Sequence, residues 1–203
     1  MEAETYNAED RVRYKLVRWK LGKSGGIDMR PGRLAPRVLK RLRELGSVVA
    51  PRVVAACSGI LWNRWCTERR FSREGFCTLG CEHPAADSIE HYAHCKAVHD
   101  VAKKTLTLHC EGPLAIEWFM LARKELADEG TLVCMAVLIY ATYTTTNRMR
   151  KLGIKDMGTA VEALEQKIRE AIRSHRHSEK VINSRWAEVE NRPKRRRRTE
   201  RLG

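Results

Sequence analysis

The feature that most constrains this chain is a crowd of cysteine and histidine residues in one short segment. Seven of these residues lie between positions 76 and 100: Cys77, Cys81, His83, His91, His94, Cys95 and His99. Thiolate and imidazole ligands select zinc over magnesium or calcium, and pairs of such residues at short spacing are typical of structural zinc sites. The segment therefore predicts that one metal ion organises the fold around it.

Cys77 and Cys81 form the first pair of the predicted site. Three residues separate them, which lies within the spacing of known zinc ligands. Gly80 permits the tight turn that lets both sulfurs point inward. A redox-active cysteine pair is a weaker interpretation, because the spacing is not C-x-x-C and no parallel βαβ pattern surrounds it.

His91 and Cys95 form the second pair, on a helix predicted from residue 89 to about residue 108. Asp87 is predicted to cap this helix, with Glu90 reaching back to the cap. His91 and Cys95 are then four residues apart on one helical face, close enough to chelate one ion. Since protein side chains would fill all four positions, we expect a closed, structural site that holds one zinc ion.

The other histidines compete for the imidazole position. His99 is also four residues from Cys95 and is the main rival of His91. His94 would point about 100° away from Cys95 on a helix, and His83 would need a tighter loop. Outside the cluster, four cysteines in apolar helical surroundings are expected to be free thiols in the core: Cys57, Cys66, Cys110 and Cys134.

Helical periodicity extends over most of the chain. Apolar residues recur at helical spacing in segments 8–21, 36–45, 48–71, 89–108, 114–126, 132–150, 159–172 and 174–191. The segment at 132–150 is apolar nearly all round at its start, which indicates a central, buried helix. The predicted fold is mainly α: a multi-helix domain with a small irregular zinc knuckle of the CCHC type.

This pattern divides the chain into four parts. We expect basic N-terminal helices at 1–47, a zinc-binding helical core at 48–110, and C-terminal helices at 111–190 that pack on that core. Residues 191–203 are almost wholly basic and cannot bury a core, so a disordered tail is predicted there.

The charge balance points to a polyanionic partner. The chain carries 39 Lys and Arg against 25 Asp and Glu, a net charge of +14. Clustered cations bind phosphates with release of counterions, and arginine beside aromatic residues suits RNA or single-stranded DNA. The residues predicted to bind nucleic acid are Arg64, Arg69, Arg70, Arg73, Lys194, Arg195, Arg196, Arg197 and Arg198.

The sequence also predicts where the chain works. No secretory signal and no apolar run of membrane-spanning length is visible, so we expect an intracellular protein with no membrane partner. The basic run at 194–198 is typical of nuclear import signals, which favours the nucleus. The tryptophans beside the first basic stretch, Trp62 and Trp65, are expected to lie in the core.

Several motifs together resemble a known family. Trp62-x-x-Trp65, the two cysteines at 77 and 81, and the segment Asp87-Ser-Ile-Glu-His91 with Cys95 are similar to the zinc-binding region that follows the polymerase in non-LTR retroelement reverse transcriptases. The resemblance covers about residues 58–106, and it implies a zinc site in which His91, rather than His99, is the histidine ligand. The first cysteine pair is one residue wider than in many members.

Three functional classes follow from these observations. The favoured one is a zinc-stabilised nucleic-acid-binding module derived from a retroelement. The alternatives are a zinc-organised protein-interaction domain and a retroelement remnant without function. We expect no enzymatic activity, since no Tyr/Phe-x-Asp-Asp segment is present for nucleotidyl transfer, and the few acidic residues near the cluster are explained by helix capping.

Overall fold

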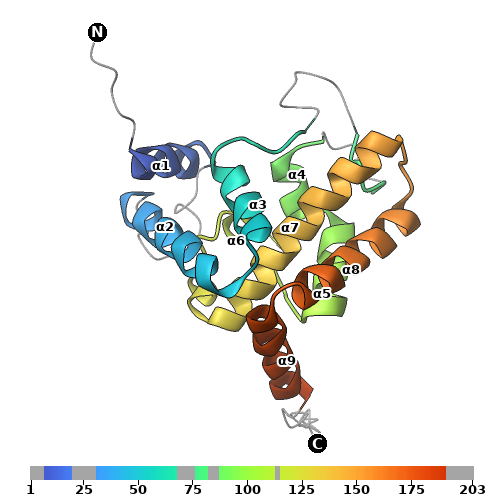
Figure 1. Cartoon of the computed structure of the whole chain (residues 1–203). Coiled ribbons are helices and arrows are strands. Elements are labelled where there is room, and N and C mark those ends of the chain that lie inside the picture. Colours follow the sequence, from blue (N-terminus) through green and yellow to red (C-terminus); the bar gives the residue numbers. More distant parts are fainter. Residues whose placement is uncertain (1–6, 20–30, 68–75, 82–86, 113–114, 191–203) are drawn as a thin grey trace, which may run out of the picture.

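The computed structural model describes residues 7–19, 31–67, 76–81, 87–112 and 115–190. Within these ranges the chain forms nine α-helices and one 3-10 helix, with no β-strand (Figure 1). The predicted fold class, a mainly α multi-helix domain, is confirmed.

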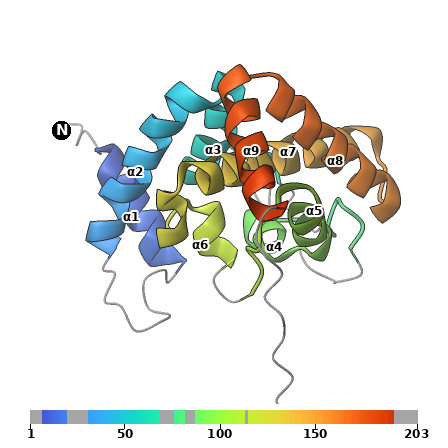
Figure 2. The ribbon, with the colours of Figure 1, turned by 90° about the horizontal axis from the view of Figure 1, so that it is seen from below.

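Helix α7 (Glu129–Leu152) is the central element of the fold. It begins at Asp128, whose carboxylate accepts a hydrogen bond from the Thr131 amide at 2.7 Å. Helices α2, α3, α8 and α9 pack directly on it, and both views show α1 and α2 at the left of the fold and α5 and α8 at the right (Figures 1 and 2). Residues 133–139 are fully buried, as predicted. No helix in the described ranges is long and apolar enough to cross a membrane, α7 included.

The N-terminal helices are α1 (Ala8–Arg18) and α2 (Pro31–Val48), which pack on each other. α1 buries Val12 and Leu16, in agreement with the apolar periodicity of segment 8–21. α2 begins five residues before the predicted start at Pro36 and continues past Gly46. Pro36 is tolerated inside the helix because an unbroken buried stripe, which includes Leu34 and Val38, holds both sides of it in place.

Helix α3 (Pro51–Leu61) starts with Pro51 in its first turn, as predicted, but ends ten residues before the predicted end. Asn63 adopts a left-handed conformation with φ 53°. The amide of Arg64 donates to the carbonyl of Gly59 at 2.8 Å, which is the closing bond of a Schellman motif. The predicted helix at 48–71 is therefore wrong at residues 62–67, because asparagine here takes the role that glycine usually has, and residues 68–71 lie outside the described ranges.

The predicted helix at 114–126 is also wrong in part. The chain instead forms α6 (Ala115–Phe119), a turn, and the 3-10 helix η2 (Lys124–Ala127). Leu121 has a φ of 57°, and its carbonyl accepts a hydrogen bond from the buried guanidinium of Arg41 at 2.5 Å. A side chain 80 positions away thus stabilises the break, and no local pattern encodes it.

Helices α8 (Met157–Arg173) and α9 (Arg176–Glu190) complete the fold. α8 packs on α5 and α7. It buries Leu164, Ile168 and Ile172, in agreement with the apolar periodicity of segment 159–172. One hydrophobic cluster runs from Val12 to Ile182 and contains residues of the first three predicted parts. The predicted basic tail at 191–203 lies outside the described residues.

Candidate metal centre

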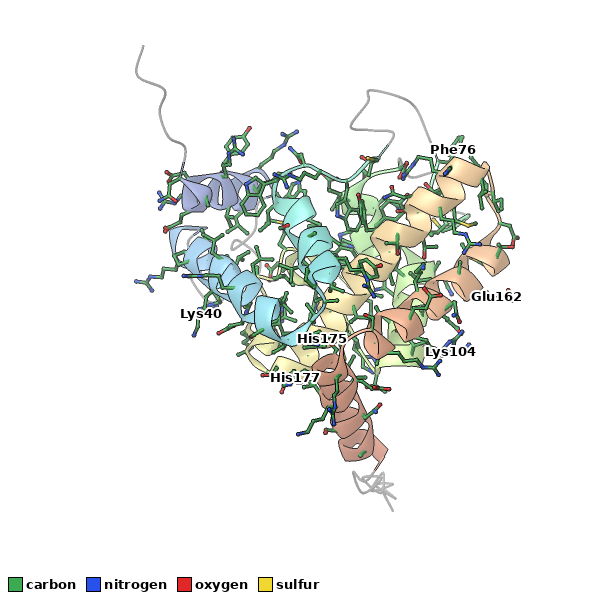
Figure 3. All side chains as sticks on the ribbon, viewed as in Figure 1. Lys40, Phe76, Lys104, Glu162, His175 and His177 are labelled. Atoms are coloured by element: carbon green, nitrogen blue, oxygen red, sulfur yellow. The ribbon has the colours of Figure 1, made fainter. Side chains whose placement is uncertain are left out.

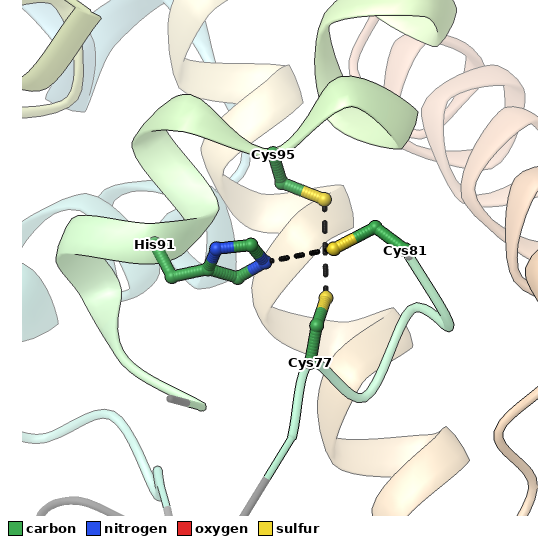
Figure 4. Close-up of side chains that lie close together, drawn as sticks. All are labelled: Cys77, Cys81, His91 and Cys95. Carbon is green, nitrogen blue, oxygen red and sulfur yellow. Dashed lines mark hydrogen bonds between the residues drawn. The ribbon is translucent and has the colours of Figure 1, made fainter. Parts of the chain in front are cut away.

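Cys77, Cys81, His91 and Cys95 converge on one point (Figure 4). Their ligand atoms all lie within 4.8 Å of one another. The sulfurs of Cys77 and Cys95 are 3.9 Å apart, and the sulfur of Cys81 lies 3.2 Å from Nε2 of His91. The loop pair and the helix pair that the sequence predicted thus meet at a single site.

These separations are within about 0.3 Å of those around a tetrahedral metal ion. Zn–S bonds of about 2.3 Å and Zn–N bonds of about 2.0 Å imply ligand atoms roughly 3.5–3.8 Å apart. The two distances above lie on either side of that range. A disulfide would need sulfurs about 2.05 Å apart, and all the cysteines of the cluster are free thiols. The donor set and its spacing therefore suit a metal ion better than a disulfide.

The loop pair is held in place by Gly80 and its neighbours. The Gly80 amide donates to the Cys77 carbonyl at 3.1 Å, which closes a turn, and Gly80 itself has a φ of 69°. A Cβ atom at this position would lie 2.7 Å from the backbone nitrogen of Met157. Glycine is required here twice, for the left-handed conformation and for close contact with the start of α8.

The helix pair differs from the prediction. Instead of one helix at 89–108, the chain forms α4 (Ile89–His94) and α5 (Lys96–Leu106), and Cys95 lies extended between them with ψ 123°. Cys95 therefore projects from a helix junction and not from a helical face. Hydrophobic periodicity missed the break because both short helices bury apolar residues on the same core.

The cap of α4 also differs from the prediction. Ser88, not Asp87, accepts the hydrogen bond from the His91 amide, at 3.1 Å. Both residue types are good N-caps, so the sequence alone could not separate two adjacent candidates. Asp87 instead turns into the protein, where its carboxylate is fully buried.

Asp87 belongs to a buried polar network beside the ligands. Arg150 of α7 donates to it through Nε at 3.0 Å and through Nη2 at 3.2 Å. The Tyr92 hydroxyl donates to Asp87 and lies 2.8 Å from the hydroxyl of Thr78. Burial, together with the charge of Asp87, raises the pKa of Tyr92, so the phenol stays neutral and keeps its proton for this bond. The network ties both ligand pairs to the central helix.

The Cys77 thiol is neutral in the metal-free cluster. The hydrogen bond with Cys95 and burial raise the pKa of the Cys77 thiol to about 12, while His91 opposes the shift. Without a cation this thiol is protonated at neutral pH. Thiolate is the form that binds metal, so metal binding here is expected to release protons.

The remaining histidines and cysteines lie elsewhere. Nδ1 of His99 is 3.5 Å from the sulfur of Cys110, so this histidine is engaged away from the cluster. His94 is exposed, and His83 falls outside the described residues. Cys57, Cys110 and Cys134 are buried, as predicted, whereas Cys66 is exposed. The prediction of a core position for Cys66 is wrong because α3 ends before it.

The predicted nucleic-acid-binding residues are described in one case only. Arg64 is exposed, just after the end of α3. Arg69, Arg70 and Arg73 lie outside the described residues, as does the run of Lys194, Arg195, Arg196, Arg197 and Arg198. Of the two tryptophans predicted in the core, Trp65 is buried and donates to the Ala56 carbonyl at 3.0 Å, but Trp62 is only partly buried.

The sequence did not indicate the residues that support the ligands. Arg150 is 63 positions from Asp87, and nothing in its local pattern distinguishes it from other basic residues of a helix end. Figure 3 shows the side chains of the helices that surround the site, with Phe76 labelled one residue before the first ligand. Tyr92 and Thr78 carried a signal, since each directly follows a predicted ligand.

Comparison with known proteins gives no match: none of the protein-family models, curated proteins or solved structures searched is similar to this chain. What the four ligands do must therefore follow from their geometry and chemistry.

Proposed function

We propose that this protein is a nucleic-acid-binding module stabilised by one structural zinc ion. The observation that carries the proposal is the convergence of three thiols and one imidazole within 4.8 Å, in a chain of net charge +14. Three sulfur ligands favour zinc over the harder divalent ions. Protein side chains supply a full tetrahedral set, which is the mark of a structural rather than a catalytic zinc site.

His91 and Cys95 match the second ligand pair of the retroelement zinc-binding region that the sequence resembles, and Cys77 and Cys81 resemble its first pair with one residue more between them. That likeness supports zinc as the ion and nucleic acid as the partner, with RNA or single-stranded DNA favoured. The basic run at 194–198 supports a nuclear location. On this proposal the ion shapes the fold, and binding rather than catalysis is the function.

Metal analysis tests the first half of the proposal. We expect about one zinc ion per chain, and we expect chelation to unfold the helices around the site. Cys77→Ser and Cys95→Ser should each abolish zinc retention. Cys66→Ser is the matched control, because this cysteine is exposed and lies outside the cluster. Zinc retained by both cluster variants would show that the ligand set is wrong.

A binding titration across a series of salt concentrations tests the second half. We expect labelled single-stranded RNA or DNA to bind, with an affinity that falls steeply as salt rises, because phosphate contacts release counterions. The zinc-loaded protein is the sample, and an acidic peptide of similar charge is the control. An absent or salt-independent binding signal would remove nucleic acid from the proposal.

A protein-interaction domain is the second candidate. Phe76, Leu152 and Met157 are apolar yet 67%, 56% and 42% exposed. They belong to the metal loop and to the α7–α8 connection that Gly80 contacts. Exposed apolar residues near one another are typical of docking surfaces. Loss of a protein partner on Phe76→Ser, with nucleic acid binding absent, would favour this candidate.

A further inference from the structure

A cleft opens where α1 meets the end of α3 and the start of α4. Its volume is about 410 Å³, within the ~300–1,000 Å³ range of ligand sites. The described residues that line it include Lys15 and Arg18 of α1, three tryptophans (Trp19, Trp62 and Trp65) and Glu90 of α4. Trp19 and Trp62 are partly exposed, so their rings can contact a ligand, whereas Trp65 is buried in the core.

A second hollow, of about 360 Å³, adjoins the first. The two share Lys15, Trp62 and Asn63, and the second adds Arg11 and Tyr14. Tyr14 is 63% exposed. Trp62 thus borders both hollows, and aromatic side chains follow one another along a continuous surface.

The cations of this surface are placed among the aromatic rings. Nζ of Lys15 lies 4.8 Å from the centre of the Trp19 ring, and it also donates to the side-chain oxygen of Asn63. Arg11 and Arg18 are exposed at the rims. Among the described residues that line the two hollows, Glu90 is the one carboxylate, and it accepts a hydrogen bond from Nε1 of Trp19 at 3.1 Å. The described lining is therefore net positive.

We infer that this cleft binds an unstacked base of a single-stranded nucleic acid, with Trp62 as the stacking surface and Arg11 and Arg18 near the phosphates. Single-stranded nucleic acids bind to surfaces on which aromatic rings alternate with cations. The rings stack on the flat faces of the bases, and the cations lie near the negatively charged phosphates. A duplex keeps its bases stacked inside and cannot fill the cleft. The inference rests on the proposed function and locates it on the surface.

The cleft is coupled to the metal centre. Ser88, Ile89 and Glu90 form one wall, and they are the cap and first turn of α4. Ser88 accepts the hydrogen bond of the His91 amide, so the ligand and the wall belong to the same short helix. Six residues of helix are not stable alone, and we expect removal of the metal to disorder this wall.

The test compares two labelled strands of equal length and charge on the zinc-loaded full chain: oligothymidylate, and the same backbone in which every nucleotide is abasic. We expect oligothymidylate to bind about tenfold more tightly at one fixed salt concentration, since stacking of a base contributes that order of affinity. Trp62→Ala should lower the affinity for oligothymidylate to that for the abasic strand and leave the affinity for the abasic strand unchanged. Trp62→Phe should retain part of the difference.

Phe76→Ala is the matched control, an exposed aromatic residue outside the cleft that should leave the ratio of the two strands unchanged. Photocrosslinking of wild-type protein to a strand with 5-iodouracil gives a second measurement that needs no variant. We expect the adduct on Trp62, Trp19 or Tyr14.

The outcomes distinguish a failure of the inferred base-binding cleft from a failure of the proposed nucleic-acid binding. Equal binding of both strands by wild-type protein, or adducts only outside the cleft, overturns the inference and leaves nucleic acid binding intact. If Trp62→Ala loses the same affinity for both strands while its zinc content is preserved, that result also overturns the inference. Failure of both strands to bind at low salt removes the proposed function itself, and the inference with it.

Discussion

Asp87 and Arg150, 63 positions apart, form a two-pronged ion pair in which Nε donates to Oδ2 at 3.0 Å and Nη2 donates to Oδ1 at 3.2 Å. The carboxylate is fully buried, and the arginine side chain is 21% exposed. The pair joins the residue just before α4 to the far end of the central helix. It is therefore a direct polar link between the segment that carries the helix pair of the cluster and the core.

Loss of the arginine should be strongly destabilising. Arg150→Met leaves Asp87 as a buried charge without its cation, and we expect the free energy of unfolding to fall by about 3 kcal/mol. Urea denaturation of the zinc-loaded protein measures it. The double variant with Asp87→Asn should recover part of the loss, because it removes the uncompensated charge. Arg148→Met, exposed on the same helix, should change stability by less than about 0.5 kcal/mol.

If the single and double variants lose the same amount, the pair is not coupled and the link between centre and core lies elsewhere.

Two glycines have nearly the same backbone conformation but different surroundings. Substitution of each by alanine can therefore distinguish the cost of the left-handed conformation from the cost of a close contact. Gly80 and Gly153 have φ of 69° and 67°, but a Cβ at Gly80 would lie 2.7 Å from a backbone nitrogen, whereas nothing lies within 4 Å at Gly153. Gly153→Ala should cost about 1–2 kcal/mol, the penalty of the left-handed conformation, and leave zinc affinity unchanged. Gly80→Ala should cost more and weaken zinc binding. Calorimetry with zinc, beside urea denaturation, checks both, and equal effects would show that the contact with α8 does not position the loop.

The residues that the structure brings together at the candidate metal centre were predictable because ligand chemistry is local. Cys77 and Cys81 are separated by one short turn, and His91 and Cys95 by another, so sequence spacing limits their geometry. Long helices such as α7 were equally clear, since a buried helix leaves an apolar pattern over many residues.

What the sequence did not predict depends on contacts made across the fold. At Cys95 the backbone is extended between α4 and α5. Both helices bury apolar residues in the same core, so the helical spacing of apolar residues in the sequence continues across the break. The turn at Leu121 needs the guanidinium of Arg41, and the buried place of Asp87 needs Arg150. In each case a partner from another helix decides a conformation that local propensity leaves open.

The identity of the histidine ligand can be tested by comparing two positions. His91 lies in the cluster, and His99 lies beside Cys110. His91→Ala should weaken zinc binding by more than the ~10–100-fold typical for loss of an outer partner, because it removes a ligand itself. His99→Ala should leave one zinc ion per chain. Competition with a zinc chelator measures both affinities, and the reverse order would assign the site to His99.

His99 should instead make stability depend on pH. Burial is the largest cause that lowers its pKa below the usual value near 6.5, and the carboxylate of Glu111 opposes it. The unfolded chain therefore binds a proton at a higher pH than the folded chain does. By linkage, the contribution of His99 to stability is full above about pH 6.5 and is lost as the pH falls below that value.

A pH series of urea denaturation between about pH 5 and 8 tests this dependence. Acid also weakens zinc binding through the ligands, but that effect is common to wild-type protein and variants, so the difference between their pH profiles isolates His99. His99→Gln should show a shallower loss of stability toward acid, since glutamine cannot bind the proton. A His99→Gln profile parallel to wild type would mean that the folded protein accepts the proton as readily as the unfolded chain does, because only a difference between the two states can make stability depend on pH.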